Sequence, residues 1–265
     1  MRGQADRALA APLVLLPLLL FSCLTAVITD DPPEPTRAKT SKPRLLVQLL
    51  VVLAIVALFG LAAMSFYGVG PRALGSIPVW SGLFNWLLGL GRALHVGAPA
   101  AISNPVLEFA LPLALLLALG ARWRDLGIAS GHRVGRVLVL WSAPLLVNLG
   151  VLIVTGQAQP LRLIGVFIRN GFQNGPAEEF LFRGALLTRL SLLFGGGWGL
   201  ALSAFVFGVF HVGVNARLET GGDVLAAACA GIAGQMPYGI ALGVIFQRTR
   251  NLLAGSVTHM LIDLP

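Results

Sequence analysis

The chain has 265 residues, of which 56% are hydrophobic and only 11% are charged. A soluble domain usually carries about 25% charged residues, so this composition excludes an ordinary soluble protein and predicts an integral membrane protein. The formal charge of +8 comes mostly from arginines in short segments between apolar runs. That distribution is typical of charges that orient a protein in a membrane, and no basic stripe with interleaved aromatic residues indicates a nucleic-acid partner.

The chain begins with an apolar run and a polar linker. Residues 1–30 carry two arginines before a Leu-rich stretch, which predicts the first membrane span, with a signal peptide as the alternative. Residues 31–44 are rich in proline and charge, which predicts a flexible linker on the cytoplasmic side.

Residues 45–155 are predicted to form the N-terminal membrane helices. The basic residues Arg44 and Arg122 flank part of this region, and both are expected to face the cytoplasm. An even number of crossings must then separate them. The short segment 79–90, rich in Trp and Gly, is therefore not expected to span the membrane.

Residues 160–265 contain further hydrophobic segments. Gly239 and Gly243 lie one helical turn apart in one of them, and small residues at this spacing predict close helix packing. The predicted segments are 161–172, 176–194, 198–214, 224–246 and 251–265.

Three charged residues lie close together in one of these apolar segments. Glu179 and Arg183 are four positions apart with the acid first, which favours an ion pair on a helix. Glu178 lies about 100° around the helix from Glu179 and has no such partner. Charge at membrane depth is costly, so we interpret Glu178 as a functional carboxylate. The alternative is structural: Pro176 could begin a helix whose first turn favours acidic residues.

Other polar residues stand out in the last third of the chain. His211 is the one ionisable residue in segment 198–214, and His259 and Asp263 share the last apolar segment. A single histidine of this kind more often bonds across a helix interface than acts in catalysis. Because two histidines occur together with a buried carboxylate, we expect them to converge in one wet cavity.

These residues form three motifs in order. Glu178-Glu179-xxx-Arg183, Phe207-xxx-His211 and His259-xxx-Asp263 together resemble the motifs of the CPBP intramembrane proteases, which include the type II CAAX prenyl endopeptidases and the bacterial Abi proteins. The resemblance covers residues 160–265, so this region is expected to be a CPBP-like catalytic core.

The resemblance implies peptide-bond hydrolysis by an activated water. Glu178 would act as the general base, His211 would position the water, and His259 would stabilise the oxyanion. Glu179 and Arg183 would form a supporting pair, with Phe207 beside them. Asp263 stands where the family often has Asn; an ionised Asp cannot donate to an oxyanion, but it can orient His259.

The resemblance implies no metal, and we expect no cofactor. Zinc stays possible, because one carboxylate with two histidines is a known catalytic zinc set.

The sequence thus predicts an all-α, polytopic membrane bundle of about 7–8 hydrophobic helices around an internal polar cavity. The favoured function is an intramembrane endopeptidase in a bacterial inner membrane, with membrane lipid and a peptide or membrane-protein substrate as partners and no nucleic acid. One alternative is a non-catalytic protein of the same fold, used for bacteriocin immunity or scaffolding. Another is a transporter, although no inverted repeat is detectable.

Overall fold

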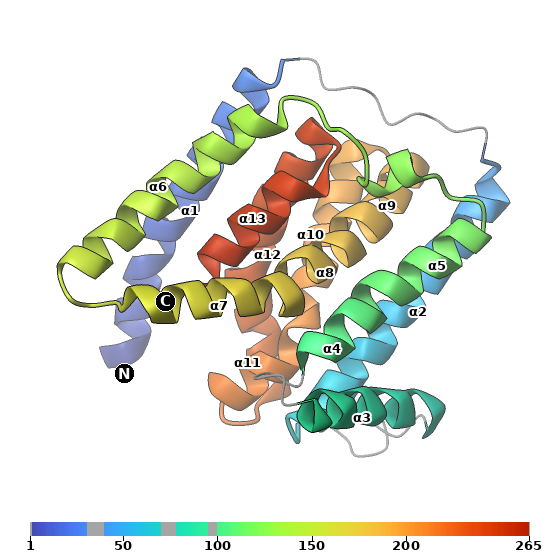
Figure 1. Cartoon of the computed structure of the whole chain (residues 1–265), viewed down its shortest axis with the longest axis horizontal. Coiled ribbons are helices and arrows are strands. Elements are labelled where there is room, and N and C mark those ends of the chain that lie inside the picture. The colour runs from blue at the N-terminus through green and yellow to red at the C-terminus, as the bar shows by residue number, and fades with distance from the viewer. Residues whose placement is uncertain (1, 31–39, 70–77, 95–99, 265) are drawn as a thin grey trace.

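The computed structural model describes residues 2–30, 40–69, 78–94 and 100–264, and these residues form helices and loops without a β-strand. The chain starts with α1 (Arg2–Ile28) and α2 (Lys42–Phe66), which Figure 1 shows at opposite sides of the molecule. Most of the predicted linker, residues 31–39, lies outside the described part of the chain.

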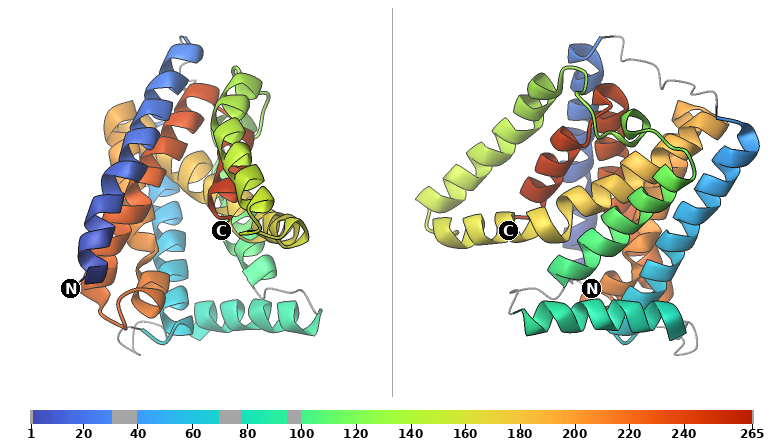
Figure 2. Two further views of the ribbon diagram at one scale, coloured as in Figure 1. Left: turned by 90° about the vertical axis from the view of Figure 1, so that its left-hand side faces the viewer. Right: turned by 45° about the vertical axis from the view of Figure 1, so that its right-hand side comes forward.

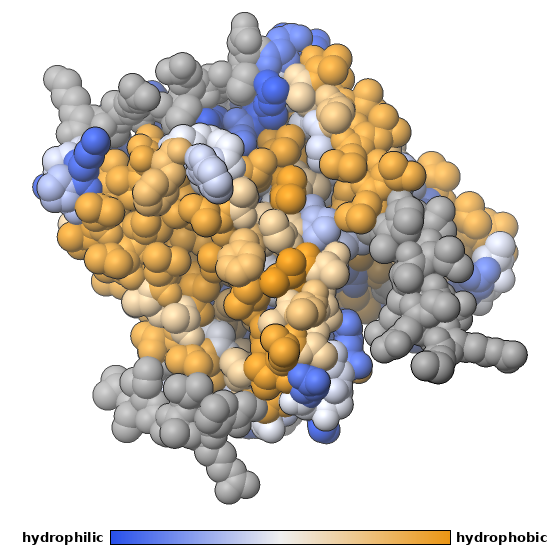
Figure 3. Space-filling view, turned by 180° about the vertical axis from the view of Figure 1, so that it is seen from behind, coloured by the Kyte–Doolittle hydropathy of each residue, from blue (hydrophilic) through white to orange (hydrophobic). Residues whose placement is uncertain are grey.

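Among the described residues, five helical stretches are long and apolar enough to cross a membrane. This confirms the predicted multi-pass helical bundle. Figure 3 shows apolar side chains over the middle of the molecule and hydrophilic ones towards its ends. The five stretches are α2; α4 (Ala100–Asn104) continued by the π-helix η2 (Pro105–Ala110) and α5 (Leu111–Ala118); α6 (Val134–Val154); α10 (Gly196–Phe210) continued by α11 (Val212–Leu218); and α12 (Val224–Thr249).

Two helices run across the others. The helix α3 (Pro78–Ala93) is not among the candidate spans, in agreement with the prediction for residues 79–90. The helix α7 (Pro160–Gln173) is not among them either, and Figures 1 and 2 show both helices lying crosswise to the long ones. Residues 161–172 were predicted only as a further hydrophobic segment. Arg162 and Arg169 make this helix amphipathic, which suits its crosswise position.

The basic loops gather at one end of the molecule. The Arg44 guanidinium lies beside Gly120, and Gln48 Nε2 donates a hydrogen bond to the Leu119 carbonyl at 3.0 Å. At the same end Arg133 forms an ion pair with Asp30, 2.6 Å apart. The starts and ends of these helices therefore agree with an even number of crossings between Arg44 and Arg122.

The charged motif lies on the helix that occupies the centre of the bundle. This helix consists of α8 (Gly175–Glu179), the π-helix η4 (Phe180–Leu187) and α9 (Thr188–Phe194). Side chains on all of its faces are buried, because α2, α5, α10 and α13 (Leu252–Ile262) pack around it. The helix ends at Gly195, whose positive φ of 88° suits glycine.

Glycine allows two close contacts of this central region. A side chain on Gly184 would meet the Leu126 carbonyl, which belongs to the 3-10 turn η3 (Trp123–Leu126). On α12, Gly239 lies against Ala204 of α10 and Gly243 lies against Leu200. The close packing predicted from the two α12 glycines is thus confirmed.

Candidate active site

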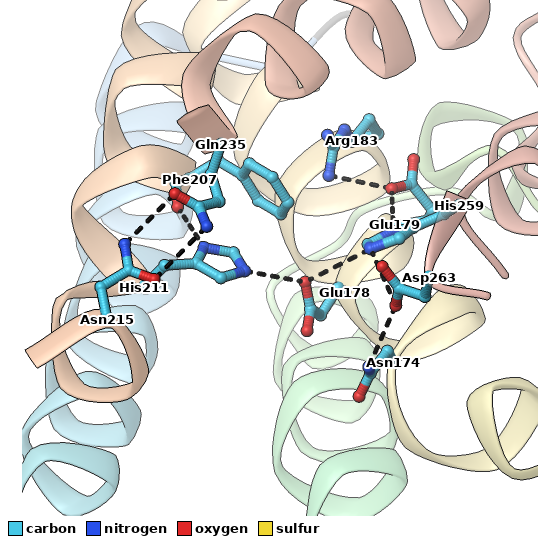
Figure 4. A network of polar contacts seen from close by, with 10 residues as sticks. All are labelled: Asn174, Glu178, Glu179, Arg183, Phe207, His211, Asn215, Gln235, His259 and Asp263. Atoms are coloured by element: carbon cyan, nitrogen blue, oxygen red, sulfur yellow. Dashed lines mark hydrogen bonds and ion pairs between the residues drawn. The ribbon is translucent and has the colours of Figure 1, made fainter. Parts of the chain in front are cut away.

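A cavity of about 730 Å³ lies between the helices and is lined by residues from both halves of the chain. Its polar wall comes from the motif segments, and Figure 4 shows these side chains pointing towards one another. Its aromatic wall comes mainly from α2, α3 and α10. The aromatic wall consists of Phe59, Phe66, Tyr67, Phe84, Phe207 and Phe210.

Glu178 is the residue on which the polar groups converge. It lies in the first turn of α8 and its residue is only 7% exposed. Its Oε2 atom is 3.9 Å from Nε2 of His211 and 3.9 Å from Nε2 of His259. No hydrogen-bond partner of the described residues reaches this oxygen. The three side chains that the sequence predicted to meet therefore lie around one point.

His211 sits at the break between α10 and α11, where it caps the first helix. Its Nδ1 lies 2.8 Å from the Phe207 carbonyl oxygen. Because a carbonyl only accepts, Nδ1 must donate, and the neutral ring therefore presents an accepting Nε2 towards Glu178. A water between Nε2 and the carboxylate could donate one hydrogen to each.

His259 is held by the other acid of the motif. Its Nδ1 donates to Glu179 Oε1 at 2.9 Å, and the same oxygen lies 3.0 Å from Arg183 Nη1. Glu179 and Arg183 are each 1% exposed, and the guanidinium also lies 4.4 Å from the centre of the Phe207 ring. The pair expected to hold the helix thus also fixes the orientation of His259, which the motif spacing did not indicate.

Asp263 has a different set of neighbours from the one expected. Its Oδ2 is 3.7 Å from His259 Nε2 and accepts a hydrogen bond from Asn174 Nδ2 at 3.1 Å. Glu179 is the closer acceptor and binds the other ring nitrogen, so the role of Asp263 in orienting His259 stays a prediction. Asp263 faces the cavity near the point where Glu178 and His259 meet.

Several cavity residues were missed at the sequence level. Asn174 directly precedes the motif, and Gln235 exchanges amide hydrogen bonds with Asn215 beside His211, at 3.2 and 3.4 Å. Nothing in the sequence distinguishes these amides from other polar residues. Glu108 is also in the cavity wall, and as a lone acid in an apolar segment it could have been found by the reasoning applied to Glu178.

The cavity was also compared with the requirements of a metal ion. Within the described ranges, no group of three or more His, Cys, Asp or Glu side chains is arranged to hold one. One ring nitrogen of each histidine is engaged by a carbonyl or a carboxylate, and the other faces Glu178. Carbonyls and carboxylates also hold the second ring nitrogen of metal-binding histidines, so the expectation of no cofactor stays a prediction.

A comparison with protein-family models agrees with the site. Residues 160–265 match the model described as "Rce1-like: Type II CAAX prenyl endopeptidase Rce1-like". No curated protein and no solved structure matches the chain significantly. The matched region holds Glu178, His211 and His259, whereas much of the aromatic wall lies outside it. Residues 160–265 of this multi-pass membrane protein are therefore similar to the type II CAAX prenyl endopeptidases of that model.

Proposed function

We propose that the protein is an intramembrane endopeptidase that hydrolyses a peptide bond with a water activated by Glu178 and His211. The observation that carries this proposal is the equal 3.9 Å spacing from Glu178 Oε2 to the two imidazole Nε2 atoms. A water within hydrogen-bond distance of all three atoms fits such a spacing. The family of residues 160–265 supports the same reaction class.

The reaction begins with proton transfer from this water. Glu178 takes the proton, His211 Nε2 accepts the second hydrogen in a hydrogen bond, and the water oxygen attacks the carbonyl carbon of the substrate. His259 acts as an imidazolium with both ring nitrogens protonated. Its Nδ1–H is bonded to Glu179, and its Nε2–H donates to the oxyanion that forms. Glu179 and Arg183 hold this ring in place.

We further propose that the reaction needs no metal ion. The two imidazoles are oriented by a carbonyl and a carboxylate, and they supply an acceptor and a donor for the steps above. The substrate class is a peptide or membrane-protein segment that reaches the cavity from a bacterial inner membrane. The aromatic wall beside the polar groups fits such an apolar segment.

The test is cleavage of co-expressed candidate peptides in membranes, with the wild type compared with Glu178→Gln. Loss of cleavage in the variant, at unchanged amount and thermal stability of the protein, is the expected result. Glu219→Gln is the matched control, because Glu219 is another glutamate but lies outside the cavity. Cleavage that survives Glu178→Gln would refute the assignment of the base.

A zinc chelator added to the same membranes tests the metal-free part separately. Cleavage should persist unchanged in the chelator. A cellular phenotype that persists in both Glu178→Ala and His211→Ala would instead favour the non-catalytic alternative of the same fold.

A further inference from the structure

One buried acid of the cavity has no role in the steps above. Glu108 lies in the π-helix η2, and π-turns of this kind occur frequently at functional sites. The residue is 0% exposed, and neither carboxyl oxygen has a hydrogen-bond partner. A buried polar group without a partner costs about 1–3 kcal/mol, so its presence calls for a reason.

Glu108 belongs to the same cavity as Glu178. Its side chain is part of the cavity wall, and η2 packs directly against α8 and η4. The next residue, Phe109, packs against Phe180, which lies two residues after Glu178, with the ring centres 4.5 Å apart and the rings tilted by 45°.

The acids of the cavity differ in their neighbours, and the neighbours determine which acid is protonated. Glu178 has two imidazoles nearby, Glu179 has Arg183 and His259, and Asp263 has an amide donor. Glu108 has no cation or donor among the described residues. A buried carboxyl without a cation or a donor does not ionise readily, so Glu108 keeps its proton, whereas the two imidazoles favour the charged form of Glu178.

We propose that Glu108 is the proton donor to the amine that leaves when the peptide bond breaks. This inference rests on the proposed function. Glu178 takes a proton from water as the C–O bond forms. The C–N bond then breaks, and the Glu108 O–H proton passes to the departing nitrogen. Finally the proton on Glu178 moves to Glu108 through cavity water, so that both acids return to their starting states and no outside proton donor is needed.

The carboxyl of Glu108 is closed to solvent before substrate binds. Its three side-chain torsions allow it to turn into the adjacent cavity once a peptide fills that space. Until then burial protects the proton from exchange with bulk water. If Glu108 had only a structural role, its loss would slow the release of every leaving group equally. This difference allows a direct test.

The experiment compares two substrates with the same acyl part: a peptide amide and a nitrophenyl ester. The phenolate leaves the ester without gaining a proton, whereas the amine must gain a proton to leave the amide. Glu108→Gln keeps the shape and a hydrogen-bond donor but cannot transfer a proton. It should lower amide turnover by about 10²-fold and change ester turnover by less than about threefold, with KM unchanged.

Further variants separate the possible outcomes. Glu108→Asp should recover part of the amide turnover, and Ser103→Ala, a buried neighbour outside the cavity wall, should affect neither substrate. Equal losses on both substrates in Glu108→Gln, or no loss on either, would refute the role of Glu108. Hydrolysis of both substrates that survives Glu178→Gln would instead refute the proposed function itself.

Discussion

The two ends of the central helix each bury an arginine, and they use it differently. Arg183 at the site end lies between Glu179 and the Phe207 ring, and through Glu179 it fixes His259. Arg189 at the other end donates to the Gly184 carbonyl at 2.9 Å and to Gln48 Oε1 at 3.2 Å. The first arginine is neutralised by an acid, whereas the second is solvated by carbonyl and amide oxygens. Arg183 thus supports a residue of the candidate site, whereas Arg189 supports only the packing of the helices.

The largest effect is expected at the site end. Arg183→Met leaves the buried charge of Glu179 with His259 as its one remaining partner among the described residues, which should lower stability by about 3–5 kcal/mol and abolish turnover. The double variant Glu179→Gln, Arg183→Met removes both charges and should recover much of the stability, but not the orientation of His259. Thermal unfolding in detergent measures the difference. Equal destabilisation in the single and double variants would show that the pair is not coupled.

A smaller effect, on stability alone, is expected at the opposite end. Arg189→Met leaves the Gly184 carbonyl without its donor and should cost about 1–3 kcal/mol. Turnover per folded molecule should be unchanged, because Arg189 is not part of the cavity wall. Gln48→Leu removes a partner of the same arginine and serves as the matched comparison. A lower turnover per folded molecule in Arg189→Met would contradict this separation of the two ends.

The smallest effect is expected from Asp263→Asn. The carboxylate accepts from Asn174 and lies 3.7 Å from His259 Nε2, so the amide can take over the position and add a donor. Turnover should stay within about tenfold of the wild type, whereas Asp263→Leu should reduce it further by removing both hydrogen-bonding functions. Steady-state hydrolysis of one peptide by the wild type, Asp263→Asn and Asp263→Leu ranks the turnover of the three proteins. Equal rates for Asn and Leu would exclude a polar role for this residue.

The sequence allowed more of the site to be predicted than of the helix arrangement. Hydropathy indicates which segments are apolar, and the spacing of Glu178, His211 and His259 suggested that they meet. The crosswise α7 was missed, since a 14-residue apolar stretch with two arginines fits an interfacial helix as well as a short upright one. The bond from His259 to Glu179 was missed because it joins residues 80 positions apart, and helix spacing reports only local pairs.

The aromatic wall has a consequence for how members of this family differ. Apart from Glu108, the residues proposed to act in hydrolysis lie in residues 160–265, but Phe59, Tyr67 and Phe84 come from the part of the chain that the family model does not cover. The shape of the aromatic wall can therefore be altered in α2 and α3 while the residues proposed for hydrolysis, Glu108 included, stay in place. Exchanging α2 and α3 between relatives should transfer the choice of peptide without transferring the reaction.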